Sequence, residues 1–255
     1  MIKVASAVVL CAVVSASLAA PSALAASPPT VDKIVAKYVA ARGGLTKIRS
    51  VQSLRQKGHV TAGPNQEGVV MRELKRPAHT RFELKVQGVT AVFVSDGKQG
   101  WRVNPFDGDA ERKPLSDEVV AEAAEQGDFE GPLVDWKAKG HKVELAGQED
   151  LAGRPAYKLK VTLASGGVRY DYIDVKSMNL VRTETTRQVR GRPVQIQATF
   201  GDFKKTDGLL FPHFVEVAAA GRPNTLRIDV ESVEVNPELS DARFAMPASA
   251  QKPLP

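Results

Sequence analysis

The sequence predicts a mostly β protein with some helix, arranged as a single open antiparallel β-barrel with an N-terminal helix and a helical insert. Alternating apolar and polar residues, typical of strands with one wet face, occur in two groups along the chain. A helix-like stretch at residues 116–140 separates the two groups. Short turns join the strands, and about ten or eleven strands enclose more space than their own side chains fill. We therefore expect a half-barrel whose concave face is closed by the insert.

The N-terminus has the features of a secretory signal peptide. Lys3 precedes an apolar run over residues 4–20, and residues 23–25 form an Ala-x-Ala cleavage site. We expect residues 1–25 to be removed and residues 26–255 to form one β domain. The alternative is a retained membrane anchor, for which the run and its flanks are a poorer match. An exported chain of this kind would be soluble, and would lie in the periplasm of a cell with two membranes.

Charge and cysteine content exclude several classes of protein. The single cysteine, Cys11, lies in the predicted signal peptide, so the mature chain has no disulfide and no thiol chemistry. The formal net charge is +6, but Lys and Arg alternate with Asp and Glu, which indicates solvated strand faces. The aromatic residues are too few to suggest a stacking platform for bases. We expect no nucleic-acid partner and a monomeric chain.

The first group of elements begins with a helix predicted over residues 31–42, capped by Thr30 and ended by two glycines. Strands follow, separated by turn signals such as Gln87-Gly88 and Asp96-Gly97. The alternation is clearest where Phe82 and Leu84 face one side of the sheet. The predicted strands cover residues 50–61, 66–76, 79–86, 89–95 and 100–103, and a turn-rich loop follows at residues 104–108.

The insert consists of two predicted short helices, over residues 116–127 and 132–140. Phe129, Leu133 and Trp136 are spaced i, i+4 and i+7, so they form one apolar stripe if the turn between the helices is helix-like. We expect an apolar stripe of this kind to pack into a concave apolar surface, and the curled sheet provides one.

The second group of strands continues the alternation. In the last strand, Ile228 and Val230 share one phase, whereas Val233 and Val235 share the other. A β-bulge near residues 231–232 would restore the phase and bend the sheet. The predicted strands cover residues 157–163, 168–172, 194–200, 209–217 and 225–235.

Four stretches of the sequence resemble one known family. They are residues 101–108 (WRVNPFDG), 128–135 (DFEGPLVD), 201–213 (GDFKKTDGLLFPH) and 244–247 (FAMP). They are similar to landmarks of the LolA-like, outer-membrane lipoprotein-sorting proteins, and residues 34–58 are similar as well. The resemblance therefore covers nearly all of the mature chain.

The resemblance implies an incomplete β-barrel with helices closing its mouth and a hydrophobic cavity that receives acyl chains. The expected partners are lipid acyl chains or an acylated lipoprotein, together with a membrane-associated protein. The expected function is non-enzymatic sorting of lipoproteins or lipids toward the outer membrane. An alternative on the same scaffold is a sensor of envelope stress or a protein-interaction module, since regulators that restrain anti-sigma factors also resemble this fold.

The sequence offers little support for an enzyme or a metal site. It contains no Gly-x-Ser-x-Gly elbow, no phosphate-binding glycine loop and no His-Glu-x-x-His motif. The oxygens of Asn104, Asp107, Asp109 and Glu111 could face calcium, but an Asp-Gly turn explains this loop equally well. We expect no cofactor and no metal. The four histidines, at positions without short ligand spacing, are His59, His79, His141 and His213.

The remaining candidates for a ligand-facing surface are apolar and aromatic side chains. Some come from strand positions expected to point into the barrel, and others come from the insert and the loop before it. The alternative is that these residues complete the core. The candidates are Phe82, Leu84, Trp101, Phe106, Phe129, Leu133, Trp136, Tyr157, Leu159, Tyr170, Ile196 and Phe200.

Overall fold

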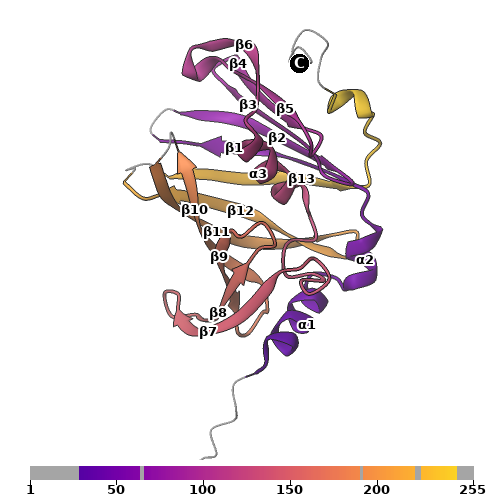
Figure 1. Ribbon diagram of the computed structural model, residues 1–255, viewed down its shortest axis with the longest axis vertical. Helices are drawn as coiled ribbons and strands as arrows, with labels where there is room; N and C mark the ends of the chain where they lie inside the picture. The colour runs from indigo at the N-terminus through magenta and orange to yellow at the C-terminus, as the bar shows by residue number, and fades with distance from the viewer. Residues whose placement is uncertain (1–28, 64–65, 190–191, 222–224, 246–255) are drawn as a thin grey trace, which may run out of the picture.

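The computed structural model describes residues 29–63, 66–189, 192–221 and 225–245 of the 255-residue chain. In these ranges, 13 strands form one sheet that curls into an open half-barrel, with α3 inside the curl (Figure 1). All neighbouring strands are antiparallel. The predicted fold is therefore confirmed. The predicted signal peptide lies outside the described residues.

The elements follow one another along the chain with short connections. The helices are α1 (Val31–Ala41), α2 (Leu45–Ser50), η1 (Pro105–Asp107), α3 (Asp117–Gly127) and η2 (Asp241–Arg243). None of these helices is both long and apolar enough to cross a bilayer. The first strands are β1 (Ser53–Thr61), β2 (Glu67–Lys75), β3 (His79–Val86), β4 (Val89–Ser95), β5 (Gly100–Asn104) and β6 (Asp109–Pro114). The later strands are β7 (Lys142–Asp150), β8 (Pro155–Thr162), β9 (Val168–Asp174), β10 (Leu180–Val189), β11 (Arg192–Thr206), β12 (Leu209–Ala219) and β13 (Leu226–Val235).

The sheet consists of two meanders joined by one long-range pairing. Strands β1 to β6 lie in chain order, as do β7 to β13, and the pairing of β1 with β13 unites them. As a result, β6 and β7 are the two opposite edges of the sheet. The segment that links β6 to β7 therefore has to cross from one edge of the curled sheet to the other. This topology places the insert over the concave face.

A β-bulge interrupts the pairing that joins the two meanders. Lys57 pairs with Ser232, but the next residue, Gly58, pairs with Val230, which leaves Glu231 as the extra residue. The predicted bulge is confirmed. A Cβ atom at Gly58 would lie 2.2 Å from the carbonyl oxygen of Asp229, so the close approach of the two strands at this bulge requires glycine.

The sequence analysis did not predict three of the strands and one of the helices. Strands β3 and β4 have the predicted bounds, whereas β6, β7, β10 and α2 were not predicted. Strands β6 and β7 are edges of the sheet and are rich in charged residues, which is how edge strands avoid pairing with other chains. Strand β10 carries Thr, Glu and Arg residues in place of an apolar phase.

The prediction of a second helix in the insert, over residues 132–140, is wrong. Residues 128–140 form a series of turns, and only α3 is helical in the insert. Gly131 has φ 78° and Asp135 has φ 52°, and a right-handed helix cannot continue through such residues. Pro132 favours a helix start, but Gly131 and Asp135, which lie between the residues of the apolar stripe, bend the chain instead.

The core lies between the helical end of the molecule and the later strands. The side chain of Thr30 caps α1 by accepting a hydrogen bond from the Lys33 amide at 3.4 Å. Helix α1 then buries Ile34, Val35 and Tyr38 against β7, β8 and β9. Burial of this kind contributes about 1.5 to 3 kcal/mol for each large apolar side chain. The fully enclosed members of this cluster are Ile34, Val35, Tyr38, Leu133, Val143, Leu159, Val161 and Ile173.

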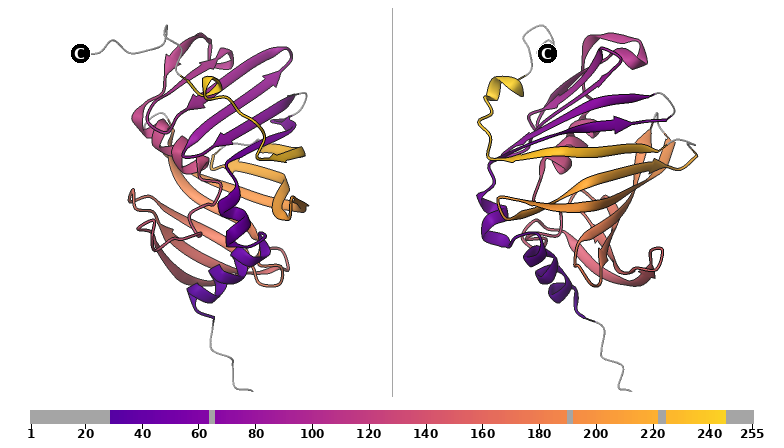
Figure 2. Two further views of the ribbon diagram at one scale, coloured as in Figure 1. Left: turned by 90° about the vertical axis from the view of Figure 1, so that its right-hand side faces the viewer. Right: turned by 180° about the vertical axis from the view of Figure 1, so that it is seen from behind.

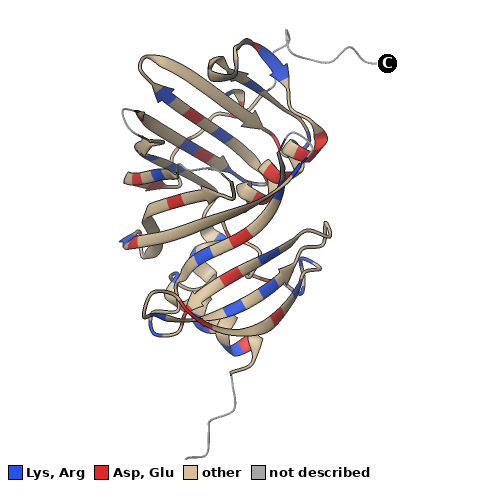
Figure 3. Cartoon of the chain, turned by 90° about the vertical axis from the view of Figure 1, so that its left-hand side faces the viewer, with Lys and Arg blue, Asp and Glu red and all other residues tan. Residues whose placement is uncertain are grey.

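The outer face of the first meander is covered by the C-terminal segment, residues 236–245. Leu239 and Phe244 pack on Val94 and Trp101. In Figure 2 this segment and α3 lie on opposite sides of β1 to β5. Elsewhere the strands carry interspersed charges of both signs, as Figure 3 shows from one side. That pattern agrees with solvated strand faces rather than with a site for a polyanion.

Candidate functional site

The candidate site is the concave face of the middle strands. Residues that lie directly opposite each other in antiparallel strands share a face. Ala198 pairs with Val217, which pairs with Leu226. Further along β13, Ile228 pairs with Val60. Together these positions form a continuous apolar surface, which we call the apolar floor. It comprises Val60, Val70, Leu84, Ile196, Ala198, Phe200, Val215, Val217, Leu226 and Ile228.

The apolar floor is less covered than the core beneath α1. Leu159 and Ile173 are 0% exposed, whereas the floor residues of β11, β12 and β13 are all half-buried. An aligned set of apolar side chains that stays partly open is a common feature of ligand sites and interaction surfaces. The floor therefore leaves apolar side chains partly accessible on the concave face.

Helix α3 bridges the two sides of the half-barrel above the concave face. The Arg72 guanidinium on β2 donates a hydrogen bond to the Gln126 carbonyl oxygen at 2.7 Å. On the other side, Arg187 of β10 forms an ion pair with Glu122, and the Ser165 hydroxyl donates to Glu125 at 3.0 Å. The helix itself buries only Val120 and Gly127. A helix held mainly by polar contacts at the surface is easy to displace.

A cavity lies between α3 and strands β2 to β4. Its volume is about 220 Å³. Phe82 and Phe93, which pair across β3 and β4, form part of its wall on the sheet side. Val119 and Ala123 form part of the wall on the helix side. The cavity shows that α3 does not pack tightly on the sheet here.

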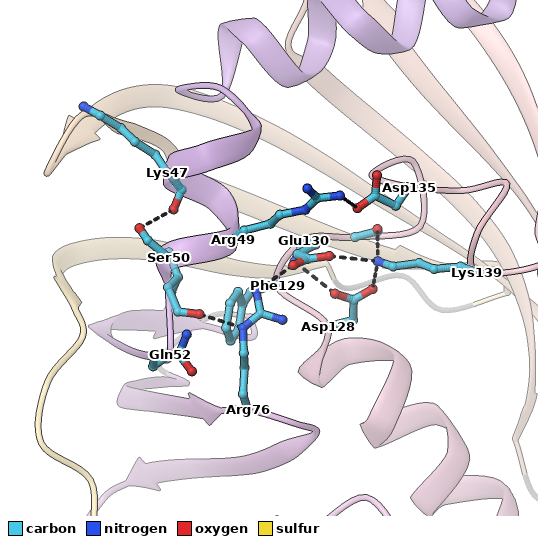
Figure 4. Close-up of polar contacts among 12 residues, drawn as sticks. Lys47, Arg49, Ser50, Gln52, Arg76, Asp128, Phe129, Glu130, Asp135 and Lys139 are labelled. Carbon is cyan, nitrogen blue, oxygen red and sulfur yellow. Dashed lines mark hydrogen bonds and ion pairs between the residues drawn. The ribbon is translucent and has the colours of Figure 1, made fainter.

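The rest of the insert, residues 128–140, is fastened by charged groups (Figure 4). Arg42, which ends α1, donates to the Glu130 and Phe129 carbonyl oxygens, the latter at 2.7 Å. The Arg76 guanidinium lies 4.8 Å from the centre of the Phe129 ring and donates to Glu130 Oε1 at 2.6 Å. Lys139 Nζ lies 2.5 Å from Asp128 Oδ2. This arrangement holds the insert to α1 and to the turn between β2 and β3.

Glu130 is the buried centre of this fastening. Burial opposes its ionisation, but the hydrogen bond and charge of Arg76, with the charge of Lys139, outweigh burial. The pKa of Glu130 therefore lies below its ordinary value of 4.5. A depressed carboxylate pKa means that the ionised form stabilises the fold above pH 4.5, and that this contribution is lost as the pH falls through the folded-state pKa.

We expect Glu130→Gln to lower the free energy of unfolding near pH 7 by about 1.5 to 3 kcal/mol, the range for hydrogen bonds to charged groups. The wild type should then lose stability between about pH 5 and pH 3, while the variant loses less, so the two curves converge in acid. Urea unfolding at a series of pH values measures this. Glu118→Gln, an exposed acid on α3, is the control and should change little. Parallel curves for Glu130→Gln and wild type would contradict the assignment.

Four of the sequence-predicted site residues lie on the concave face together. Leu84, Ile196 and Phe200 belong to the apolar floor, and Phe82 lines the cavity beneath α3. They come from β3 and β11, which lie on opposite sides of the β1–β13 pairing. The curl of the sheet therefore turns both groups of strands toward one hollow.

Five other candidates lie in the core near the helical end. Leu133 and Leu159 are members of the core cluster beneath α1, and Tyr157 and Trp136 pack against it. Phe129 packs against the clusters beneath α2 and between β1 and β2. The reading that these residues complete the core was an open alternative, and their burial agrees with it. Within the insert, the part held mainly by polar contacts is therefore α3 rather than the stripe at residues 129–136.

Three candidates lie away from the concave face. Tyr170 pairs with Lys160, the neighbour of Leu159 on β8, whose side chain points to the opposite face of the sheet from Leu159. The prediction that Tyr170 points inward is therefore wrong. Trp101 packs beneath the C-terminal segment, and its Nε1 donates to the Ala245 carbonyl oxygen at 3.0 Å. Phe106 is exposed in η1. Trp101 and Tyr170 have partners that the alternation of the strands does not reveal.

Polar residues on the concave face were not predicted. Arg72 interrupts the apolar phase of Val70 and Leu74 on β2, and this interruption is a signal that the sequence does contain. Asp171 similarly lies opposite Leu159, where it is fully buried and accepts a hydrogen bond from Arg169 Nε at 2.8 Å. Burial raises the pKa of Asp171 despite the charge of its arginine partner.

Among the described residues, no group of three or more His, Cys, Asp or Glu side chains is arranged to hold a metal ion. The side chains of Asp107 and Asp109 in the loop considered for calcium lie outside those described. His59 faces Glu231, and His141 Nδ1 accepts a hydrogen bond from the Ala164 amide. These two histidines thus have separate partners.

Solved structures with a similar fold are found, although no protein-family model and no curated protein sequence matches the chain. A LolA superfamily protein from Nitrosomonas europaea has a TM-score of 0.57 at 14% identity, over 86% of this chain and 99% of that one. A DUF1329 family protein from Desulfovibrio piger has a TM-score of 0.55 at 14% identity, over 88% and 100%. A putative outer membrane lipoprotein-sorting protein domain from Vibrio parahaemolyticus has a TM-score of 0.51 at 10% identity, over 84% and 95%.

These likenesses show that the chain has a LolA-like fold, as the resemblance of its sequence stretches implied. Sequence identities this low establish only the fold, because proteins that share one fold can have many different functions. The function has to be argued from the site.

Proposed function

We propose that this chain is a non-enzymatic binding protein that holds the acyl chains of a lipid or lipoprotein on its apolar floor. The observation that carries this proposal is that the aligned apolar side chains of the floor on β11, β12 and β13 are only half-buried. Its setting would be the periplasm, after removal of residues 1–25, with residues 26–255 as one lipid-binding domain. Its role there would be to sort lipoproteins or lipids, meeting a membrane-associated protein at each end of the transfer.

The energetics of acyl chains support a site of this shape. Hiding one methylene group from water contributes about 0.8 kcal/mol, so an exposed sixteen-carbon chain costs about 12 kcal/mol. A carrier must therefore enclose most of the chain and must also release it. The curled sheet supplies the enclosure, and α3, which buries only two residues, is suited to move aside.

The proposal is tested by asking whether the protein carries and binds acyl chains. We expect the mature chain, purified from a periplasm, to retain acylated molecules that native mass spectrometry detects. After delipidation, a triacylated lipopeptide should raise its melting temperature, since a ligand at about 100 times its Kd stabilises by about 2.7 kcal/mol. The same peptide without acyl groups is the control. Absence of bound lipid, together with no thermal shift for lipopeptide or phospholipid, would rule the proposal out.

A further inference from the structure

The cavity beneath α3 combines apolar walls with one cation that has no ion-pair partner, since the second arginine of its lining, Arg81, is paired with Glu83. The cation is Arg72, which projects from β2 into the space between the sheet and α3. The volume of about 220 Å³ is below the range of about 300 to 1,000 Å³ for pockets that enclose a drug-sized ligand. The cavity thus has room for one end of a lipid-sized molecule. Its apolar lining includes Leu74, Phe82, Phe93, Leu115 and Val119.

Arg72 has no counter-ion among the described residues. Its hydrogen bond goes to a neutral group, the Gln126 carbonyl oxygen, and burial lowers the pKa of its guanidinium. Arg72 is half-buried, and a cation removed in part from water without an opposite charge is costly to the fold. An anion that enters the cavity would relieve this cost, and the low local polarity would strengthen the attraction.

One carboxylate lines the cavity, but other groups already balance it. Glu122 forms an ion pair with Arg187 and accepts a hydrogen bond from Gln126 Nε2 at 3.0 Å. Its charge is therefore directed toward β10 rather than toward Arg72. The electrostatic character of the cavity is set by the unmatched guanidinium.

The apolar surface continues from the cavity onto the sheet. Phe82 and Phe93 form one cross-strand pair, and the next pair along the same face is Leu84 with Ala91. Leu84 in turn pairs with Val70, and both belong to the apolar floor. A molecule with its polar end at Arg72 would thus find an apolar path toward β1 and β13.

We propose that the cavity beneath α3 binds the anionic head of an amphiphile, a carboxylate or phosphate group carried on an acyl chain, and that Arg72 pairs with this head. The inference rests on the proposed function, because the chain of the amphiphile lies on the apolar floor. It adds that the ligand is anionic, and that α3 and the ligand head share the same guanidinium. Bidentate pairing suits arginine and both head groups.

Isothermal titration of the delipidated mature chain at pH 8 with matched probes tests this. The probes are decanoate, decyl phosphate, decanol and inorganic phosphate. We expect both anionic amphiphiles to bind about tenfold to hundredfold more tightly than decanol. Arg72→Met should remove this preference while decanol binding stays within about threefold, and Arg72→Lys should keep part of it. Lys85→Met, which removes an exposed cation from the outer face of β3, is the matched control.

Other outcomes separate this inference from the proposed function. Equal binding of decanol and decanoate to the wild type would overturn the inference and leave acyl-chain binding intact. Failure of every ten-carbon probe would overturn both. Inorganic phosphate binding as tightly as decyl phosphate would also overturn the inference, because the acyl chain would then contribute nothing. Thermal unfolding of Arg72→Met verifies that the variant is folded.

Discussion

Replacing Phe200 with aspartate is expected to weaken acyl-chain binding by about a hundredfold or more, since an unpaired charge placed against a buried apolar ligand costs several kcal/mol. Phe200 lies on the apolar floor, paired with Val215 across β11 and β12. It is half-buried, so the new carboxylate would face the ligand. Titration with the triacylated lipopeptide measures the effect.

Two companion variants make this result specific. Phe200→Leu keeps the surface apolar and should bind within a few-fold of the wild type. Thr199→Asp adds the same charge on the opposite face of the same strand, where it meets Arg182 across β10 and β11, and should bind normally. Circular dichroism establishes that each variant is folded. Equal loss of binding in Phe200→Asp and Thr199→Asp would contradict the assignment of the apolar floor.

Replacing Glu73 with glutamine is expected to destabilise the fold by about 3 to 5 kcal/mol, as when one partner of a buried ion pair is removed. Glu73 is 0% exposed. Its carboxylate accepts hydrogen bonds from Arg55 Nε at 2.8 Å and from Arg243 Nε at 2.7 Å. Because Arg243 belongs to the C-terminal segment, this one carboxylate ties the segment to the outer face of the sheet. Urea unfolding measures the loss.

Glu234 provides a matched control for Glu73. It pairs with the same guanidinium, Arg55, at 2.8 Å, but its side chain is 40% exposed. Exposed ion pairs contribute about 0 to 1 kcal/mol, so Glu234→Gln should cost no more than this. A similar loss in both variants would show that burial does not decide the strength of this network.

Much of the fold could be predicted from local patterns. The bounds of β3 and β4 follow from strict alternation between clear turn signals, and the extra residue at Glu231 follows from a change of phase within one strand. Strand β10 could not be predicted in this way, because Thr, Glu and Arg residues occupy both of its faces and leave no apolar alternation.

The candidate site could be predicted only in part. Alternation assigns residues to two faces, but it does not say what covers each face. The strand position of Tyr170 and the aromatic character of Trp101 made both candidates for the concave face. In the structure, the C-terminal segment covers Trp101, and Lys158 Nζ lies 4.9 Å from the centre of the Tyr170 ring. Arg72 shows the opposite mismatch: it is a polar residue at a position where the alternation calls for an apolar one, and it faces the cavity.

By itself, the sequence determined that this chain forms a curled antiparallel sheet with a helical interruption, because strand periodicity, turn residues and helix caps are local properties. Only the tertiary structure decided which part of the interruption covers the concave face and which residues share the hollow. Those outcomes depend on the pairing of β1 with β13, which makes β6 and β7 the two edges. The chain between these edges has to cross the concave face, and so α3 becomes its cover.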